Sequence, residues 1–391
     1  MTSAQPFFPR PKVSDEGHRV TTFELLFDLV FVFAFTQVSG LMAHTHSALG
    51  VLQGMVILML LWTSWAAYSW LANQTHVDEG IVRVGMCVAM VAMFLVALGI
   101  PRAFAERESG IIGALVLVGA YALVRVIHIV LYLLAAGDDH ALRRQILRTG
   151  TGVVVSVGLL TAGVILGSPW QTWAWLTAVL ADGIVIYFTS SGGNWRVPSA
   201  AHWAERHGLV LILALGESIV AIGTGAANEP ISAALLAGVA LALVLSITLW
   251  WSYFDRVAGT AEKILAESMG LRRATLASTG YTYLHLPLIA GIVISALGVE
   301  TVISHVSDAE PLGLFGAIAL FGGTSLYIAG LSFFWLRMVG EPKLFPCAAA
   351  TALVIVIPVA ALLPALLALL LLVLCTTALV VVTARRSDDA S

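Results

Sequence analysis

The chain has 391 residues, of which 59% are apolar and 11% are charged, and its mean hydropathy is +0.94. A soluble domain normally carries about 25% charged residues, so this composition excludes a soluble globular protein and predicts an all-α, polytopic integral membrane protein. The net charge of −3 decides little, because the position of each charge matters more in a membrane protein than the sum.

Residues 1–20 form a polar tail without the apolar segment of a cleavable signal peptide. The stretch that follows, "TTFELLFDLVFVFAFTQ", begins an apolar helix and carries two acids, Glu24 and Asp28. Thr21 and Glu24 have the Thr-x-x-Glu spacing of a capping box, which favours a structural role for Glu24. Asp28 lies about 6 Å deeper, beyond the free helix amides. It needs a buried partner, so an ion pair and a substrate- or ion-binding role both remain open.

Twelve apolar windows approach the length of about 20 residues that a helix needs to cross a bilayer. They lie at residues 22–43, 49–71, 82–100, 110–135, 150–168, 171–190, 207–226, 232–254, 279–299, 312–336, 345–361 and 364–383. The last two come from one continuous apolar run, in which Pro358 and Pro364 predict a hairpin between two helices.

The windows divide the chain into two halves, with a weak internal similarity between them. The predicted parts are a tail (1–20), a six-helix half (21–190), a cytoplasmic linker (191–206), a second six-helix half (207–383) and a second tail (384–391). A shift of 180 residues lays "LVFVFAFTQ" over "LVLILALGE" and places Gln37 over Glu217. Two further matches follow in the same order, so we predict a parallel 6+6 internal repeat.

The distribution of Lys and Arg indicates which side of the membrane each loop occupies. If the N-terminus is cytoplasmic, the inner segments hold 17 of these residues, Arg206 of the linker among them, and the outer loops hold only Arg102 and Arg107. The remaining cation, Arg125, falls inside a span. Both termini are therefore predicted to be cytoplasmic.

Ionisable side chains inside spans are costly, so each is a candidate functional residue. Arg125 and His128 share one helix face, and Asp28 is the expected acid partner of Arg125 by depth. Asp182 and Glu217 lie nearest the middle of their spans. His285 precedes a helix-breaking proline in "YTYLHLPLIAG", a sequence typical of the broken helices at transporter sites. The predicted substrate- or ion-binding residues are Asp28, Gln37, Arg125, His128, Asp182, Glu217 and His285, with packing and ion pairing as the alternative for each.

No nucleotide-binding, nucleophile-elbow or HExxH pattern is present in the sequence, and the three cysteines lie in apolar stretches without metal-ligand spacing. We therefore predict no cofactor and no metal. The basic residues are spread over the inner segments, so no nucleic-acid partner is expected. The predicted partners are the lipid bilayer and a small solute or ion.

Four stretches together resemble the bacterial low temperature requirement protein A (LtrA) family: "TTFELLFDLVFVFAFTQVS", "ERHGLVLILALGESIVAIGTG", "LWWSYFD" and "YTYLHLPLIAGIVISALGVE". The resemblance implies a multi-pass protein of the bacterial cytoplasmic (inner) membrane that is linked to growth in the cold. It marks Glu24, Asp28, Gln37, His207, Glu217 and His285. "FDLVFVFAFT" is also similar to the pattern that opens the first helix of a lysosomal and bacterial potassium-channel family, although the serine of that pattern is absent.

The function that these features favour is a transporter or channel-like protein that uses buried carboxylates. Within the predicted spans, four carboxylates face one arginine and two histidines, and titratable acids in that setting are what a proton relay needs. The alternative is an intramembrane enzyme or a haem protein with an acid/base His/Glu/Asp site, in which His128 and His285 are the candidate ligands. No fixed residue spacing supports the alternative, so an enzyme is the less favoured class.

Overall fold

A computed structural model of the chain describes residues 11–12, 14–105, 108–190, 195–308 and 310–388. Every regular element in these ranges is a helix, and the described residues contain one isolated β-bridge, between Pro311 and Pro364. The elements form two compact units. Unit 1 contains the described residues up to His44, Ala48–Arg206 and Ser268–Ala274; unit 2 contains Thr45–Ser47, His207–Glu267 and the described residues from Thr275 onward.

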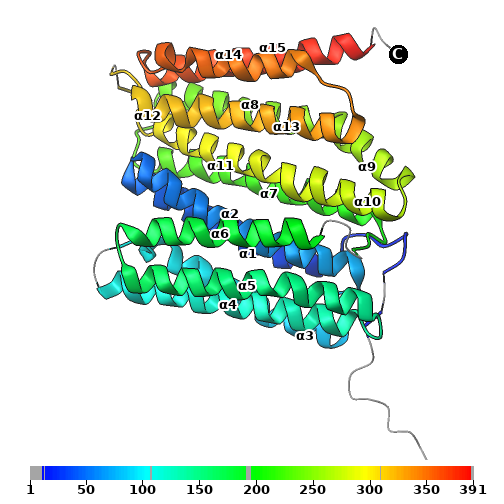
Figure 1. Cartoon of the computed structure of the whole chain (residues 1–391). Helices are drawn as coiled ribbons and strands as arrows, with labels where there is room; N and C mark the ends of the chain where they lie inside the picture. Colours follow the sequence, from blue (N-terminus) through cyan, green and yellow to red (C-terminus); the bar gives the residue numbers. More distant parts are fainter. Residues whose placement is uncertain (1–10, 13, 106–107, 191–194, 309, 389–391) are drawn as a thin grey trace, which may run out of the picture. The chain divides into compact units, whose positions relative to one another are not determined.

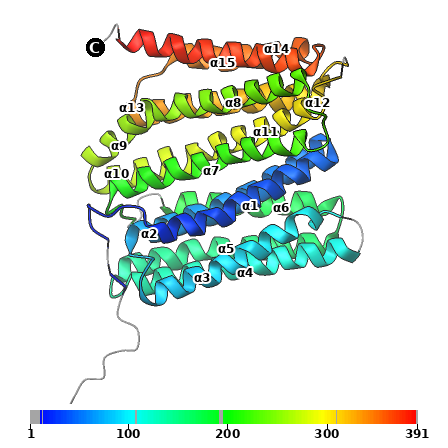
Figure 2. The ribbon, with the colours of Figure 1, turned by 180° about the vertical axis from the view of Figure 1, so that it is seen from behind.

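Unit 1 is built mainly from the first six long helices (Figure 1). The six are α1 (Thr22–Thr45), α2 (Ala48–Gln74), α3 (Gly80–Gly99), α4 (Glu108–Ala135), α5 (His140–Leu166) and α6 (Trp170–Ser190). The short 3-10 helix η1 (Ile100–Arg102) follows α3. The start of α7 (Ala200–Ala226) also belongs to this unit. Helix α5 packs along both α4 and α6, and α3 packs along α4, as both ribbon views show (Figure 2).

Unit 2 contains the rest of α7 and the C-terminal helices. These are α8 (Ala233–Phe254), α9 (Val257–Glu267), the end of α10 (Gly270–Leu276), the π-helix η2 (Ala277–Tyr283), α11 (Leu284–Ile303), α12 (Gly313–Ala317), the π-helix η3 (Ile318–Gly322), α13 (Gly323–Val339), α14 (Leu344–Ala360) and α15 (Ala365–Asp388). Helix α11 packs along α13, and α15 packs along α8.

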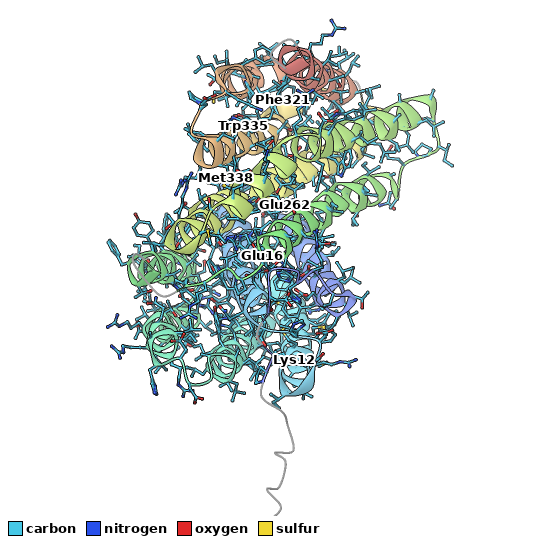
Figure 3. The ribbon with its side chains drawn as sticks, turned by 90° about the vertical axis from the view of Figure 1, so that its right-hand side faces the viewer. Lys12, Glu16, Glu262, Phe321, Trp335 and Met338 are labelled. Carbon is cyan, nitrogen blue, oxygen red and sulfur yellow. The ribbon has the colours of Figure 1, made fainter. Side chains whose placement is uncertain are left out.

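Small residues allow α11 and the segment from η3 to α13 to approach closely. A Cβ atom added to Gly291 would lie 2.5 Å from the backbone nitrogen of Tyr327, and one added to Gly298 would meet the backbone of Leu320. Such backbone proximity is the usual basis of helix association in membranes, where van der Waals packing replaces the hydrophobic effect. Met338, labelled in Figure 3, likewise packs against Gly280 of η2.

Near the break predicted at Pro287, the structure has a π-helical segment that precedes the proline. Pro287 lies inside α11, and η2 ends at Tyr283, four residues earlier. Proline has no amide to pair with the carbonyl of residue i−4, so the hydrogen-bond pattern changes at that position. π-helical segments of this kind occur often at functional sites.

The described residues contain 11 helices that are long and apolar enough to cross a membrane, and α14 is a shorter apolar helix. Large apolar side chains face outward from them, for example Val154, Ile165 and Phe188, which are 75%, 80% and 71% exposed. A surface of this kind is adapted to lipid. The prediction of an all-α, multi-pass membrane protein with about 12 membrane helices is confirmed, and the last apolar run forms two helices, α14 and α15.

One predicted boundary is wrong in a way that affects the site. The sequence predicts a cytoplasmic linker up to Arg206, whereas α7 already begins at Ala200. Ser199 precedes this helix, and its hydroxyl oxygen accepts a hydrogen bond from the amide of His202 at 3.1 Å. This is the usual geometry of an N-cap, and it makes His202 and Arg206 helical residues.

The topology can be checked by labelling single cysteines in a background in which Cys87, Cys347 and Cys375 are replaced. Ser307 is exposed in the loop between α11 and α12, and Asp138 is exposed in the loop between α4 and α5. A membrane-impermeant maleimide applied to intact cells is expected to label Ser307→Cys and to label Asp138→Cys only after lysis. The reverse pattern would overturn the predicted orientation.

Candidate functional site

Four buried ionisable side chains of unit 1 form what we call the α1–α7 cluster. Glu24 and Asp28 belong to α1, and His202 and Arg206 belong to α7; each is at most 1% exposed. Within each helix the two residues are four positions apart and therefore lie on one face. The cluster thus joins two acids of one helix to two basic side chains of another.

The first turn of α1 fixes the position of Glu24. One carboxylate oxygen, Oε1, accepts hydrogen bonds from the amide and the hydroxyl of Thr21 at 3.0 and 3.1 Å. The Thr21 hydroxyl in turn accepts from the Glu24 amide at 3.3 Å. These are the reciprocal bonds of a capping box. They leave the second oxygen of Glu24, Oε2, free to face α7.

Arg206 is held by Asp28 in a two-pronged ion pair. Nη1 and Nη2 of Arg206 donate to Oδ2 and Oδ1 of Asp28, both at 2.9 Å. The indole nitrogen of Trp65 donates to Oδ1 at 3.0 Å, and the guanidinium lies 5.4 Å from the centre of the Trp65 ring. A bidentate pair of this kind is strong and has a defined geometry, so Asp28 and Arg206 orient α1 and α7 relative to each other.

His202 is the main partner of the second Glu24 oxygen, and Asn73 determines which ring nitrogen carries the hydrogen. The amide nitrogen of Asn73 lies 2.7 Å from the carbonyl oxygen of Ser199, which can only accept, so this atom is an NH₂ donor. The same nitrogen lies 3.1 Å from Nδ1 of His202. Nδ1 is therefore an acceptor, and Nε2–H donates to Oε2 of Glu24 at 2.9 Å.

These hydrogen bonds set the charge of the cluster. With His202 neutral, the cluster holds two carboxylates, Glu24 and Asp28, and one guanidinium, Arg206, so its formal charge is −2 + 1 = −1. Nε of Arg206 is 3.6 Å from Oε2 of Glu24, too far for a good hydrogen bond. The N-terminus of α1 supplies only about half a positive charge. The cluster can therefore accept one cation.

A chain of histidine rings leads from a partly exposed position to this cluster. His76 is partly exposed, and its ring meets that of His18 at 4.5 Å; His18 stacks on His202 at 4.6 Å. His18 is 6% exposed, and its Nε2 has no hydrogen-bond partner among the described residues. Burial, with His202 nearby, lowers the pKa of His18 below its usual value of 6.5. His18 is therefore neutral at neutral pH.

His18, Glu24 and His202 also have the spacing of a metal site, since each offers a ligand atom within 4.8 Å of the other two. The bond from Asn73 argues against metal ligation in this arrangement. His202 would have to lose the hydrogen on Nε2 while its Nδ1 still accepts from Asn73. The arrangement suits a proton better than a metal ion.

A second buried cluster of unit 1 joins α4 to α6. Nη1 of Arg125 donates to Oδ2 of Asp182 at 2.8 Å and to the hydroxyl of Tyr121 at 2.7 Å. Gly152 of α5 leaves room for this pair, because a Cβ atom there would lie 2.8 Å from Oδ1 of Asp182. The cluster has one acid and one arginine, so its formal charge is balanced.

The expected pairing of Asp28 with Arg125 is wrong, because Arg206 binds Asp28 and Asp182 binds Arg125. Arg206 belongs to the span and not to a loop, and it is 1% exposed. The ring of His128, the neighbour of Arg125 on α4, meets the rings of Tyr68 and Tyr132 at 5.4 and 5.5 Å. His128 thus lies among aromatic side chains.

In unit 2, His285 lies in an aromatic cluster beside the π-helix η2. Its Nε2 lies 2.8 Å from the Tyr253 hydroxyl, and its ring stacks on Tyr281 at 5.2 Å and meets His207 at 5.0 Å. The sequence predicts His285 as a site residue, and the structure places Tyr281 of η2, Tyr253 of α8 and His207 of α7 around it. All four side chains are at most 1% exposed.

The last two predicted site residues lie further along their helices. Gln37 is partly buried on α1, about 13 Å along the helix axis from Asp28. Glu217 is 1% exposed on α7, about 15 Å along the axis from His207. Each thus lies more than two helical turns along its helix from these reference residues.

Comparison with known proteins identifies the family of this chain. The model of the bacterial low temperature requirement A protein (LtrA) matches residues 19–381, which is nearly the whole chain. The chain therefore belongs to the LtrA family, as the resemblance implies. A protein of Rhizobium meliloti (strain 1021) that is described as uncharacterized is 27% identical over 338 residues, which are 82% of this chain and 78% of that protein. No solved structure matches the chain.

The pairing of Asp28 with Arg206 can be tested by a double-mutant cycle on the purified protein. Arg206→Gln leaves two buried carboxylates without a guanidinium, and Asp28→Asn removes the two short charge-assisted hydrogen bonds of Arg206. Each change alone is expected to cost about 3–5 kcal/mol of stability. The double variant should lose less than the sum of the two single losses. Unfolding in detergent, followed by tryptophan fluorescence, gives these values.

The matched control is the pair Asp28→Asn and Arg125→Gln, whose effects should add within about 0.5 kcal/mol because the two residues share no partner. The assigned pairs would be incorrect if the stability losses of Asp28→Asn and Arg206→Gln were additive. They would also be incorrect if the losses of Asp28→Asn and Arg125→Gln were not additive.

The second cluster can be tested through α5. Gly152→Ala places a methyl group against Asp182 and is expected to destabilise the protein by about 1–3 kcal/mol. Gly158 lies on the same helix with nothing within 4 Å of the corresponding position, so Gly158→Ala should be neutral or stabilise by up to about 1 kcal/mol. Equal thermal midpoints for the two variants would contradict the close contact.

Proposed function

We propose that this LtrA-family protein transports a small solute or ion across the bacterial cytoplasmic membrane, with both termini in the cytoplasm, and that proton binding at the α1–α7 cluster drives the step. The observation that carries the proposal is that two carboxylates share one guanidinium in a cluster whose members are at most 1% exposed. Burying an unbalanced charge is costly, so the cluster has a strong tendency to take up a proton.

We propose Glu24 as the acceptor, because ring nitrogens of His18 and His202 lie close to its carboxylate. Both oxygens of Asp28 are held by Arg206, and Oδ1 also accepts from Trp65. Oε2 of Glu24 receives one hydrogen bond, from His202. Protonating Glu24 on Oε2 therefore disturbs no hydrogen bond from the guanidinium, whereas protonating Asp28 on either oxygen does. It also makes the cluster neutral.

His76 and His18 provide a route for that proton. His18 presents a ring nitrogen within 4.8 Å of a Glu24 oxygen, and its ring contacts His76, which is partly exposed. Because the pKa of His18 is lowered, this residue passes a proton on more readily than it retains one. Neutral histidines next to a buried acid are a common arrangement in proton relays.

Glu217 is the second titrating group in this proposal. It is a buried carboxylate on α7, the helix that also carries His202 and Arg206. We propose that it binds the transported solute or ion in the second of two six-helix halves of the same orientation. Protonation in the first half and binding in the second half are then coupled through one helix.

The proposal can be tested with purified protein in liposomes that contain the pH-sensitive dye pyranine. A proton gradient is imposed across the liposome membrane. Na⁺, K⁺ or one of a panel of small solutes is then added on one side. The wild-type protein is expected to give a dye response that depends on one of these species, and Glu24→Gln and Glu217→Gln should abolish it. A response that persists in Glu24→Gln would reject the proton-binding role.

Glu79→Gln is the matched control for this experiment. Glu79 is 51% exposed and forms an ion pair with Lys12 at 2.7 Å, outside the membrane helices. The same loss of charge at this surface position should leave the response unchanged. All three variants are compared after size-exclusion chromatography has shown that they are folded.

A further inference from the structure

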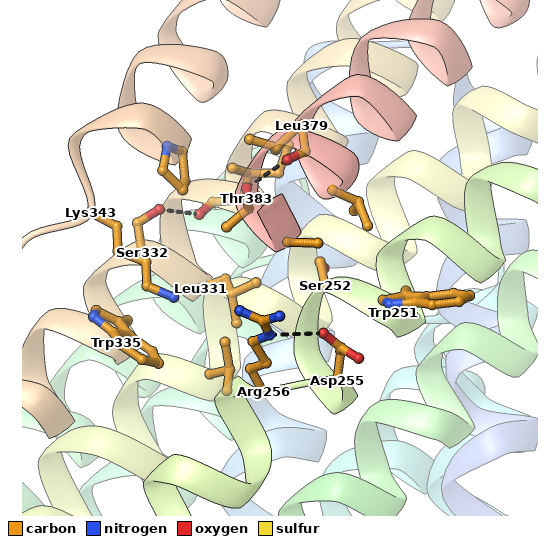
Figure 4. Close-up of a pocket in the computed structure, with 15 residues that line it drawn as sticks. Trp251, Ser252, Asp255, Arg256, Leu331, Ser332, Trp335, Lys343, Leu379 and Thr383 are labelled. Carbon is orange, nitrogen blue, oxygen red and sulfur yellow. Dashed lines mark hydrogen bonds and ion pairs between the residues drawn. The ribbon is translucent and has the colours of Figure 1, made fainter. Parts of the chain in front are cut away.

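A pocket of unit 2 lies where several helices end, and nothing in the transport proposal uses it. Residues of α8, α13 and α15 and the segment before α14 line a cavity of about 80 Å³ (Figure 4). The polar side chains around it include Asp255, Arg256 and Lys343, and the apolar ones include Leu331 and Leu379. One wall of the pocket is thus charged, and another is made of apolar side chains of the membrane helices α13 and α15.

Two cations of this pocket are close enough to affect each other. Nζ of Lys343 lies 3.3 Å from the centre of the Trp335 ring, and Nε of Arg256 lies 3.3 Å from Oδ2 of Asp255. Burial and the nearby charge of Arg256 lower the pKa of Lys343. Two cations and one acid give this wall a formal charge of +2 − 1 = +1, so it attracts an anion.

The pocket lies beside the ends of two candidate membrane spans. The membrane span that contains α13 ends at Val339, between Trp335 and Lys343, and the span of α15 ends at Arg385. Trp251 and Trp335 on its rim are the residue type that is concentrated at membrane interfaces. Basic pockets between helices at this depth bind anionic lipid headgroups.

The hydroxyl groups in the pocket add a further constraint. Ser252 donates its hydrogen to the carbonyl of Leu249 at 2.7 Å, and Ser332 donates to that of Ile328 at 2.8 Å. In this arrangement each serine oxygen keeps a lone pair that can accept a hydrogen bond. This suits a headgroup that brings its own hydroxyl donors besides its phosphate.

From the charge, the depth and these acceptors, we infer that the pocket binds an anionic glycerophospholipid whose phosphate contacts Arg256 and Lys343. Its headgroup hydroxyls donate to the two serines, and its acyl chains lie along α13 and α15. The bound lipid would join the end of α8 to α13, α14 and α15.

The inference can be tested by native mass spectrometry of the full-length protein with added lipids. Phosphatidylglycerol is expected to bind more tightly than phosphatidylcholine of the same acyl composition. Removing one charge, in Arg256→Gln or Lys343→Gln, should weaken phosphatidylglycerol binding about fivefold. Lys343→Arg should bind as the wild type does, which separates loss of charge from loss of fold.

Lys263→Gln is the matched control, because Lys263 is 77% exposed on α9 and pairs with Glu267; its phosphatidylglycerol affinity should not change. Equal affinity for the two lipids, or unchanged binding of phosphatidylglycerol to the Arg256→Gln/Lys343→Gln variant, would overturn the inference. Displacement of the lipid by millimolar inorganic phosphate would also overturn it, because the pocket would then be a site for free phosphate.

Discussion

The bidentate ion pair between Asp28 and Arg206 is the interaction on which the rest of the site depends. Both side chains are buried, and the pair links α1 to α7 at two hydrogen bonds of 2.9 Å. Because both terminal nitrogens of Arg206 are directed at Asp28, the carboxylate of Glu24 is left with His202 as its hydrogen-bonded partner from α7. The strong pair of Asp28 and Arg206 thus lies beside the weaker pair of Glu24 and His202.

The two buried clusters of unit 1 differ in what they can do. Arg125 and Asp182 balance each other and have Tyr121 as a third partner, which is the expected composition of a structural connection between α4 and α6. The pair of Glu24 and His202 contains no arginine, so its net charge changes when a proton binds to either side chain. This difference is why the proposed activity is assigned to the α1–α7 cluster.

Composition and periodicity were sufficient to predict the membrane class, the separate α14 and α15, and the burial of Asp28, Arg125 and Asp182. They could not predict partners, because which helices touch is a property of the three-dimensional packing. Arg206 was assigned to a loop because polar residues are dense just before the apolar part of α7. The signal that could have corrected this is Ser199, an N-cap residue directly before a helix-forming run.

The protonation of Glu24 can be measured directly by infrared difference spectroscopy of the purified protein during an acid titration. The account predicts that a band of a buried, protonated carboxyl group grows in the wild-type protein as the pH falls. Its intensity should fall in Glu24→Gln, where the contribution of Glu217 remains, and should be unchanged in Asp182→Asn. A band that persists unchanged in Glu24→Gln, or no band in the wild type, would contradict proton binding at the α1–α7 cluster.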